Sequence, residues 1–294
     1  MSTTSLLLDN QDWEQLIRGI KEGRCTPFLG AGISYGLLPL GAQIAQQWAQ
    51  AYNYPMADSY NLIRVSQFLA VEEYPMFPKD ELVRMFKEST VVPNLGEANQ
   101  PHRVLAELPL TTYITTNYDN FMAQALVSRF RDAKEEICRW NSQVRSRPSL
   151  FDEGYRPSPA NPVVFHLHGR IQEPYSLVLT EDDYFDFLVN VSQDTSIIPQ
   201  QIQKSLTQTS LLFIGYGLAD WNFRVLLQSL SRFMEQGLRR HHLAVMLPPE
   251  AQEGQAERSL EYWSKYYQRI NINVCWATAS DFLTELRRRW NDSQ

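Results

Sequence analysis

The sequence contains few cysteines, and they lie far apart. Its 294 residues include three, Cys25, Cys138 and Cys275, and no two of them form a CxxC pair. This set is too small and too scattered for a cysteine-rich zinc module, and its odd number argues against a disulfide framework. We therefore expect a reducing, cytoplasmic environment.

Long hydrophobic runs and an excess of positive charge are also absent. No apolar run approaches the roughly 18 residues of a membrane-spanning helix. The first 13 residues lack a basic region, and their apolar run stops at Asp9, unlike a signal peptide. The 27 basic and 33 acidic residues leave a net charge of −6. This balance argues against nucleic-acid binding through a basic face, although it leaves room for a local patch.

The composition that remains is typical of a folded globular protein, with 44% hydrophobic and 20% charged residues. Short apolar strands alternate with amphipathic helices, a pattern that predicts a mostly parallel sheet covered on both faces. The strands are expected at residues 26–29, 112–115, 163–168, 211–214, 243–246 and 271–276. Residues 41–108 carry only helical patterns, broken by prolines. We predict one doubly wound α/β domain over residues 1–294, with a helical insertion at about 40–108.

Four of the expected strands end in unusual residues: Gly30-Ala31-Gly32, Thr116-Asn117-Tyr118-Asp119, His168-Gly169 and Gly215-Tyr216-Gly217. Ligands of open α/β sheets bind beyond the carboxyl ends of the strands. This coincidence is the main physical argument for a site.

The first of these strand ends is rich in glycine, which lets a backbone approach a phosphate closely and present its N–H groups. The full GxGxxG pattern is absent because Tyr35 stands where the third glycine would be. A tight strand-to-loop turn would give the same residues, so both interpretations remain open.

Asn117 and Asp119 follow the second strand. An amide at a strand end can hold a ribose hydroxyl or a water molecule, since it offers two donors and an acceptor. The structural alternative is an Asx turn at Asn117, with Asp119 capping the next helix.

His166 and His168 are two residues apart on one expected strand, so we expect both on the same face. A metal pair is conceivable, but no third ligand stands at a suitable spacing. His168, at the strand tip, is the better candidate for a general base. A structural role is the alternative.

Two further polar runs are read as structural. Thr180-Glu181-Asp182-Asp183 is expected to be a helix N-cap followed by an acidic first turn. His241 and His242 are expected to be solvated.

Taken together in order, the segments PFLGAGIS, YITTNYDNF, VFHLHG and LLFIGYGLADWNF resemble the sirtuin-like NAD-hydrolysing proteins of bacterial anti-phage defence. The resemblance covers about residues 20–235 and implies a sirtuin-type Rossmann-like core. It implies NAD-binding roles for nine residues: Gly30, Ala31, Gly32, Ser34, Asn117, Asp119, Gly215, Tyr216 and Asp220. It also implies catalytic roles for Asn117 and His168.

The chain departs from the protein-deacylating sirtuins in two places. The four-cysteine zinc module after the HG element is missing, and YGLLPLGAQIAQQWA stands where those enzymes carry a GIPDFR-like stretch. The resemblance therefore implies NAD hydrolysis with NAD as substrate and no metal. NAD-dependent deacylation and non-catalytic nucleotide binding are the alternatives.

The resemblance also bears on control. A freely active NAD hydrolase would deplete its host, so we expect a homo-oligomer or a partner, such as a HerA-type ATPase or another defence sensor. Apolar residues on one expected helix could form either an interface with another chain or part of the hydrophobic core: Leu62, Val65, Phe68, Leu69 and Val71.

Overall fold

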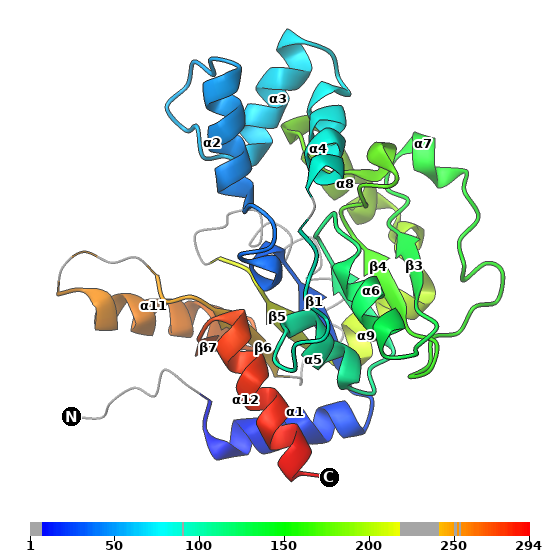
Figure 1. Cartoon of the computed structure of the whole chain (residues 1–294), viewed down its shortest axis with the longest axis vertical. Helices are drawn as coiled ribbons and strands as arrows, with labels where there is room; N and C mark the ends of the chain where they lie inside the picture. The colour runs from blue at the N-terminus through cyan, green and yellow to red at the C-terminus, as the bar shows by residue number, and fades with distance from the viewer. Residues whose placement is uncertain (1–7, 90, 218–240, 250–251, 253) are drawn as a thin grey trace.

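A seven-stranded parallel sheet forms the centre of the molecule in the computed structural model (Figure 1). The structure describes residues 8–89, 91–217, 241–249, 252 and 254–294. The strands are β1 (Cys25–Leu29), β2 (Thr112–Thr115), β3 (Lys134–Ile137), β4 (Val163–His166), β5 (Ser210–Ile214), β6 (His242–Met246) and β7 (Ile272–Trp276). Their order across the sheet is β3-β4-β2-β1-β5-β6-β7.

This order places a topological switch point between β1 and β5. From β1 the chain proceeds to β2 and β4 on one side, whereas β5, β6 and β7 extend the sheet on the other. Phe28 of β1 pairs in register with Ile114 of β2 and with Phe213 of β5. In doubly wound sheets the ligand crevice opens at this point, beyond the carboxyl ends of the strands.

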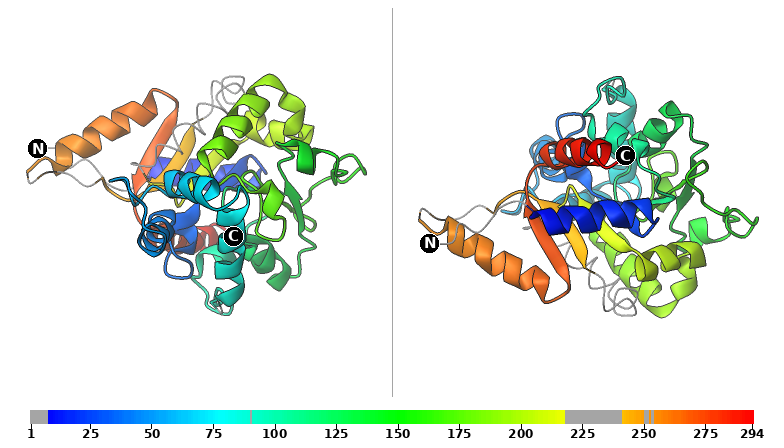
Figure 2. Two further views of the ribbon diagram at one scale, coloured as in Figure 1. Left: turned by 90° about the horizontal axis from the view of Figure 1, so that it is seen from above. Right: turned by 90° about the horizontal axis from the view of Figure 1, so that it is seen from below.

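Helices cover both faces of the sheet, as the two views of Figure 2 show. One face packs against α1 (Asn10–Lys21), α5 (Pro101–Glu107), α6 (Phe121–Ser128) and α12 (Ala279–Asp292). The other packs against α8 (Glu181–Gln193), α9 (Gln200–Gln208) and α11 (Ala256–Gln268). Because both faces are buried, the central strands read as continuous apolar runs. The short elements are α7 (Ser142–Arg145), η1 (Ala31–Ser34), η2 (Pro174–Ser176) and η3 (Thr195–Ile197).

Three helices of the predicted insertion form a layer of their own, at the top of Figure 1. They are α2 (Gly41–Ala51), α3 (Leu62–Glu72) and α4 (Phe77–Glu88), and they share a separate apolar cluster that includes Trp48, Leu69 and Leu82. The fourth helix of that stretch, α5, instead packs on α6 and α12 of the main core. The helical layer is therefore narrower than residues 40–108.

The layer is fixed to the acidic first turn of α8. Lys79 Nζ lies 2.7 Å from Asp183 Oδ1, and both side chains are largely buried. Gln67 Nε2 donates to Asp182 Oδ2 at 2.8 Å. Thr180 caps the same helix by accepting from the Asp183 amide at 3.1 Å, which confirms the predicted N-cap.

The six predicted strands are present, with ends that differ by at most two residues. The seventh, β3, was not predicted because its sequence KEEI carries three charges in four residues. It lies at the edge of the sheet, where Lys134 and Glu135 remain partly exposed. The helix expected after Gly217 lies outside the described residues. Among the helices that are described, none is long and apolar enough to cross a membrane.

Candidate functional site

The loops that follow β1, β2 and β5 meet at the switch point. The Gly30 amide donates to the Ile214 carbonyl at 2.9 Å, and the Gly32 amide donates to the Gly215 carbonyl at 2.9 Å. Asn117 Nδ2 donates to the Gly30 carbonyl at 3.2 Å. Three of the four predicted strand-end motifs therefore lie in contact.

The glycines of these loops pack backbone against backbone. Gly215 has φ +86°, and a Cβ atom there would lie 2.5 Å from the Ile33 amide nitrogen and 2.6 Å from the Gly30 carbonyl oxygen. A Cβ atom on Gly32 would lie 2.9 Å from the Gly215 Cα atom. The loops after β1 and β5 therefore need these glycines for close packing, whether or not a phosphate binds. This packing is the structural alternative to a phosphate-binding role. The Gly32 amide is committed to that packing.

The Tyr216 side chain points into the protein core and connects the loops from the core side. Its ring packs on Phe28 and Phe213, and its hydroxyl donates to the Leu29 carbonyl at 2.9 Å. The same hydroxyl lies 2.9 Å from the Thr116 hydroxyl. Tyr216 therefore braces the site from inside the core. Asp220, the remaining predicted residue of this motif, lies outside the described residues.

Asn117 is partly exposed at the end of β2. Its backbone amide donates to Thr115 Oγ1 at 3.0 Å, and its side chain reaches the Gly30 carbonyl. The side chain thus bridges two strand ends and does not close a local Asx turn. Its carboxamide oxygen faces no protein donor at hydrogen-bond distance among the described residues, and an amide oxygen can accept from a ligand hydroxyl.

Asp119 is buried below Asn117, and Oδ1 accepts from the Phe121 amide at 2.9 Å at the start of α6. The N-cap residue of α6 is Asn120, so Asp119 lies one residue before the cap position predicted for it and binds the first amide of the helix. Burial raises the pKa of Asp119, while that amide and the nearby His166 ring act in the opposite direction. The buried Ser34 hydroxyl favours the carboxylate but makes no hydrogen bond of ordinary geometry among the described residues.

His168 lies against α8, with its ring edge-on to Tyr184 and Phe187. The side chain is 4% exposed, and its Nε2 atom has no hydrogen-bond partner among the described residues. Burial lowers the pKa of His168 to about 3, so the ring is neutral at physiological pH. A buried ring nitrogen without a partner is a feature that catalytic sites often carry.

His166 does not share a face with His168, contrary to the alternation predicted for them. Strand β4 ends at His166, so the chain turns before His168 and alternation no longer applies. His166 Nε2 lies 3.0 Å from Glu135 Oε1 on β3, whereas His168 contacts α8. The two rings therefore cannot serve as a metal pair.

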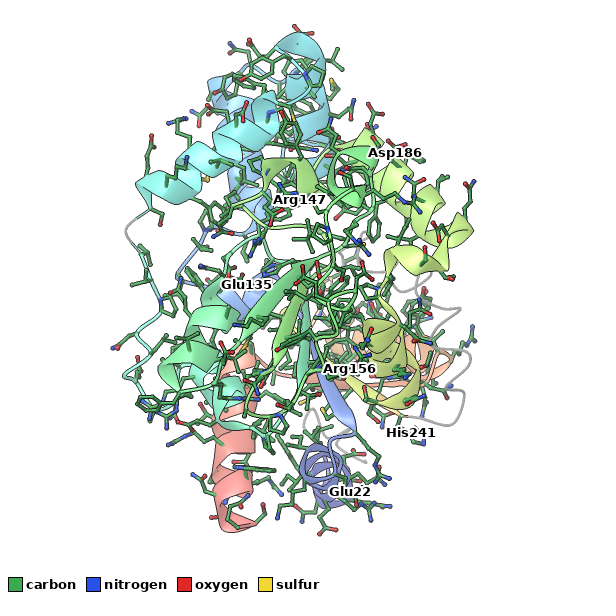
Figure 3. The ribbon with its side chains drawn as sticks, turned by 90° about the vertical axis from the view of Figure 1, so that its right-hand side faces the viewer. Glu22, Glu135, Arg147, Arg156, Asp186 and His241 are labelled. Atoms are coloured by element: carbon green, nitrogen blue, oxygen red, sulfur yellow. The ribbon has the colours of Figure 1, made fainter. Side chains whose placement is uncertain are left out.

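Glu135 is a residue of this edge that the sequence did not reveal, because β3 was not predicted. Its second carboxylate oxygen lies 3.5 Å from the Arg170 guanidinium, which also binds Glu173. Burial opposes ionisation of Glu135, but the hydrogen bond from His166 and the Arg170 charge prevail and lower its pKa. Figure 3 shows Glu135 and Arg147 on this side of the molecule.

A hollow of about 370 Å³ adjoins the glycine-rich loop. It is lined by residues 35–39 together with Gln43 and Gln47 of α2. Its volume falls within the roughly 300–1,000 Å³ of small-molecule pockets. The glycine-rich loop therefore ends beside a space that a ligand can enter.

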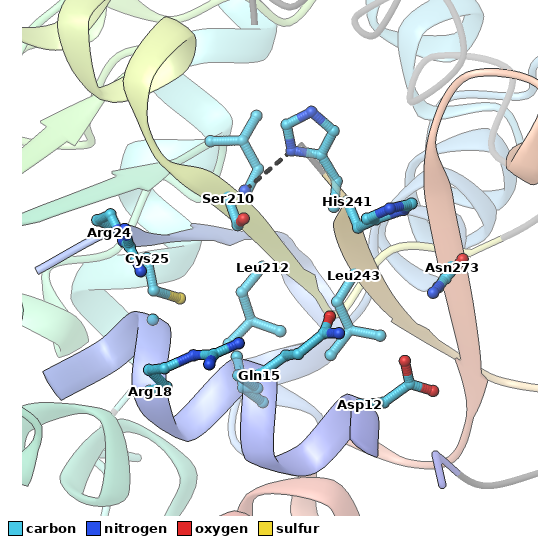
Figure 4. Close-up of a pocket in the computed structure, with 14 residues that line it drawn as sticks. Asp12, Gln15, Arg18, Arg24, Cys25, Ser210, Leu212, His241, Leu243 and Asn273 are labelled. Atoms are coloured by element: carbon cyan, nitrogen blue, oxygen red, sulfur yellow. Dashed lines mark hydrogen bonds between the residues drawn. The ribbon is translucent and has the colours of Figure 1, made fainter. Parts of the chain in front are cut away.

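A second cavity, of about 390 Å³, opens at the opposite edge of the sheet (Figure 4). It lies between α1 and the amino ends of β1, β5 and β6, with Arg18 and Asp12 on its wall. His242 is buried there and its Nδ1 accepts from the Leu211 amide at 3.0 Å, which corrects the expectation that it is solvated. His241 is exposed, as expected. Ligand sites of such sheets lie at the carboxyl edge, so this cavity is not the candidate site.

Metal ligands are not gathered at either edge. Within the described ranges, no group of three or more histidine, cysteine, aspartate or glutamate side chains is placed to hold a metal ion. The three cysteines are buried and unpaired with one another.

Comparison with known proteins agrees with this architecture. The chain is 23% identical to the NAD(+) hydrolase ThsA of Bacillus cereus (strain MSX-D12) over 279 residues, which cover 92% of this chain and 54% of that protein. It is 22% identical to ThsA of Acinetobacter baumannii (strain 532279), over 78% of this chain and 44% of that protein. Defense-associated sirtuin 2 of Bacillus subtilis is 22% identical, over 80% of this chain and 22% of that protein.

The chain thus spans about half the length of the ThsA proteins that it matches, or less. The family model described as the SIR2-like domain matches residues 111–270, more than half of the chain. That stretch contains β2 to β6 and, with them, Asn117, His168 and Gly215. The chain belongs to the SIR2-like domain family.

Proposed function

We propose that the protein is an NAD glycohydrolase that cleaves the bond between nicotinamide and ribose, giving ADP-ribose and nicotinamide. One observation carries the proposal: the Asn117 side chain lies at the switch point, 3.2 Å from the glycine-rich loop after β1. This is the crevice where doubly wound sheets take dinucleotides. The name NAD(+) hydrolase of the ThsA relatives supports NAD as the substrate and hydrolysis as the class of reaction.

The reaction does not require a general acid from the protein. Nicotinamide leaves NAD as a neutral molecule from a cationic linkage, so no proton is needed on the leaving group. The ribose passes through a state like an oxocarbenium ion, as in other glycosidic cleavages. The protein must therefore orient the ribose, stabilise the developing charge and deliver water.

Each predicted residue that the structure describes has a role in this scheme. Asn117 orients a ribose hydroxyl or the attacking water through its carboxamide. His168 offers its unpartnered Nε2 atom to a ribose hydroxyl or that water. Asp119 supports the Asn117 loop from below. The loop at Gly30, Ala31, Gly32 and Ser34 anchors the diphosphate, and Gly215 and Tyr216 shape that loop.

The low pKa of His168 limits what that ring does. A base with a pKa of about 3 accepts a proton weakly at neutral pH. We infer that His168 acts mainly as a neutral hydrogen-bond partner that orients the nucleophile, with general-base assistance as its smaller contribution.

The cellular role proposed is depletion of NAD in the cytoplasm during phage infection, under control of assembly or of a partner protein. The term defense-associated in the name of the Bacillus subtilis relative supports it. In α3, Val65 and Leu69 are buried in the helical layer, whereas Val71 is 72% exposed. Leu62 and Phe68 are partly buried against the same cluster, so of the residues considered for an interface Val71 offers the largest exposed surface.

Product analysis of the purified chain with NAD tests the reaction. We expect free nicotinamide and ADP-ribose in equal amounts. Acyl-ADP-ribose formed only with an acylated peptide would identify a deacylase, and intact bound NAD would identify a nucleotide-binding subunit.

Light scattering coupled to the same assay across protein concentration tests whether assembly controls the activity. A strict monomer whose specific activity is high and unchanged by dilution would contradict regulation by assembly.

A further inference from the structure

The partly exposed Glu135 and the buried His166 form a pair behind the Asn117 loop. They come from neighbouring strands, with Ile137 of β3 in register with His166 of β4. The His166 side chain is fully buried, and its Nε2 atom lies 3.0 Å from Glu135 Oε1. On the other side of the ring, Nδ1 lies 3.5 Å from the carbonyl oxygen of Asn117.

The two partners of the ring are both acceptors. A carbonyl oxygen cannot donate, and an ionised carboxylate accepts only. A neutral imidazole has one N–H, so with an ionised Glu135 either neutral tautomer leaves a ring lone pair facing an oxygen. Both contacts are satisfied only when the Glu135–His166 pair holds two protons. The Glu135–His166 pair as a whole, and not the ring alone, therefore meets the Asn117 carbonyl.

Other charged groups face the pair from the surrounding elements. The Asp119 carboxylate, after β2, interacts favourably with a protonated His166. Arg170, after β4, lies 3.5 Å from Glu135 and holds Glu173 with two hydrogen bonds. Arg170 favours the ionised form of Glu135.

We propose that Glu135 and His166 are positioning residues that fix the peptide carbonyl of Asn117 and so aim its carboxamide at the ligand. The catalytic consequence of this inference rests on the proposed function. The contact between His166 and the Asn117 carbonyl does not depend on it. Asn117 is then held at its amide by Thr115, at its carbonyl by His166 and at its side chain by Gly30. The edge strand β3 contributes to the site through the single side chain of Glu135.

The first test reads the contact directly and needs no activity. His166 ring signals are assigned in histidine-labelled protein by their loss in His166→Gln, and Asn117 amide signals by their loss in Asn117→Ala. We expect Glu135→Gln to shift the ring signals of His166 and, through the contact with the carbonyl, those of Asn117.

Glu136→Gln is the matched control. Glu136 is the next residue of β3, and its carboxylate accepts from Ser149 Oγ and the Leu150 amide, away from His166. It should alter thermal stability but neither the His166 nor the Asn117 signals. Should Glu135→Gln fail to fold, Glu135→Asp shortens the side chain and gives the same readouts. Unchanged His166 and Asn117 signals in a folded Glu135 variant would overturn the proposal.

The second test is kinetic. Glu135→Gln should lower kcat for NAD cleavage by roughly tenfold to a hundredfold while KM changes less than about twofold, because misplacement of an orienting group reduces turnover more than binding. An active unmodified protein with an equally active Glu135→Gln variant would refute the positioning role. An inactive unmodified protein would instead refute the proposed function, and the spectroscopic test would still decide the contact.

Discussion

The hydroxyl of Tyr216 lies 2.9 Å from the carbonyl oxygen of Leu29 and 2.9 Å from the hydroxyl of Thr116. One side chain from the end of β5 thereby joins the ends of β1 and β2. The three strand ends that frame the candidate site are tied together beneath the surface that a ligand would contact. Such support by buried hydrogen bonds is what holds a site in a fixed geometry.

Removing the Asn117 carboxamide or the His168 ring should abolish most NAD hydrolysis. Asn117→Ala and His168→Ala should each reduce kcat by roughly 10²–10³-fold, the scale of losing one oriented donor, about 2.7–4 kcal/mol. Circular dichroism and thermal unfolding check that the fold persists. Asn120→Ala, at the start of α6, is the control and should stay active. Unmodified turnover in both test variants would show that the site is assigned wrongly.

A methyl group at Gly215 should destabilise the protein, whereas one at Gly217 should not. Gly215 has φ +86° and sits against Ile33 and Gly30, while a Cβ atom on Gly217 meets nothing within 4 Å. A left-handed conformation alone costs an alanine about 1–2 kcal/mol, and displacement of the two loops adds to this. Urea unfolding of Gly215→Ala and Gly217→Ala measures the difference. Equal stabilities would contradict the loop packing.

Breaking the buried Lys79–Asp183 pair should loosen the helical layer from α8. Lys79→Met leaves a buried carboxylate without its cation, and such losses typically cost about 3–5 kcal/mol. Asp183 retains the Leu179 and Thr180 amides, so we expect a value near the lower end. The double variant with Asp183→Asn should recover part of the loss. A double-mutant cycle with no coupling would argue against the pair.

Two buried histidines should make the fold sensitive to acid. Burial lowers the pKa of His102 to about 4 and that of His168 to about 3, against about 6.5 for an unfolded histidine. Below pH 6.5 the unfolded chain binds more protons than the folded one, so stability falls as pH falls toward 4. Each group contributes at most about 1.4 kcal/mol per pH unit.

The free energy of unfolding at pH 7.5, 6.5, 5.5 and 4.5 measures this effect. His102→Gln should lessen the acid slope relative to the unmodified protein because one titrating group is gone. Identical slopes would mean that His102 is protonated in the fold.

NAD cleavage should survive chelators. The described residues provide no cluster of metal ligands, and the proposed chemistry uses an amide, an imidazole and backbone groups. Activity in excess EDTA should equal that in untreated protein, and elemental analysis should find no stoichiometric zinc. About one zinc per chain, lost together with activity, would revive the deacylase alternative.

The sequence predicted the parts of the fold whose signal is local. Buried strands such as residues 211–214 are apolar runs, and a capping pattern at Thr180 predicted the start of its helix. Strand β3 was not predicted because an edge strand with charged side chains lacks the apolar pattern of a buried strand. The helix at 101–107 could be recognised, but which face of the molecule it covers depends on contacts with α6 and α12.

The candidate site was predictable only to the level of strand ends. Parallel strands bring Gly30, Asn117 and Gly215 to one edge, so their convergence follows from topology. The orientation of each side chain does not. Tyr216 turns inward because its ring completes an apolar cluster with Phe28 and Phe213, and Glu135 enters the site only because β3 pairs with β4.

The central position of β1 has a consequence for synthesis. Residues 25–29 emerge from the ribosome well before their neighbours in the sheet, which are residues 114–115 and 210–214. At about 5–20 residues per second, the second neighbour follows after roughly 10–40 s. During that interval one edge of β1 has no partner strand, and the crevice beside it does not yet exist. The glycine-rich loop is made first, and its binding surface is completed only when Gly215 arrives.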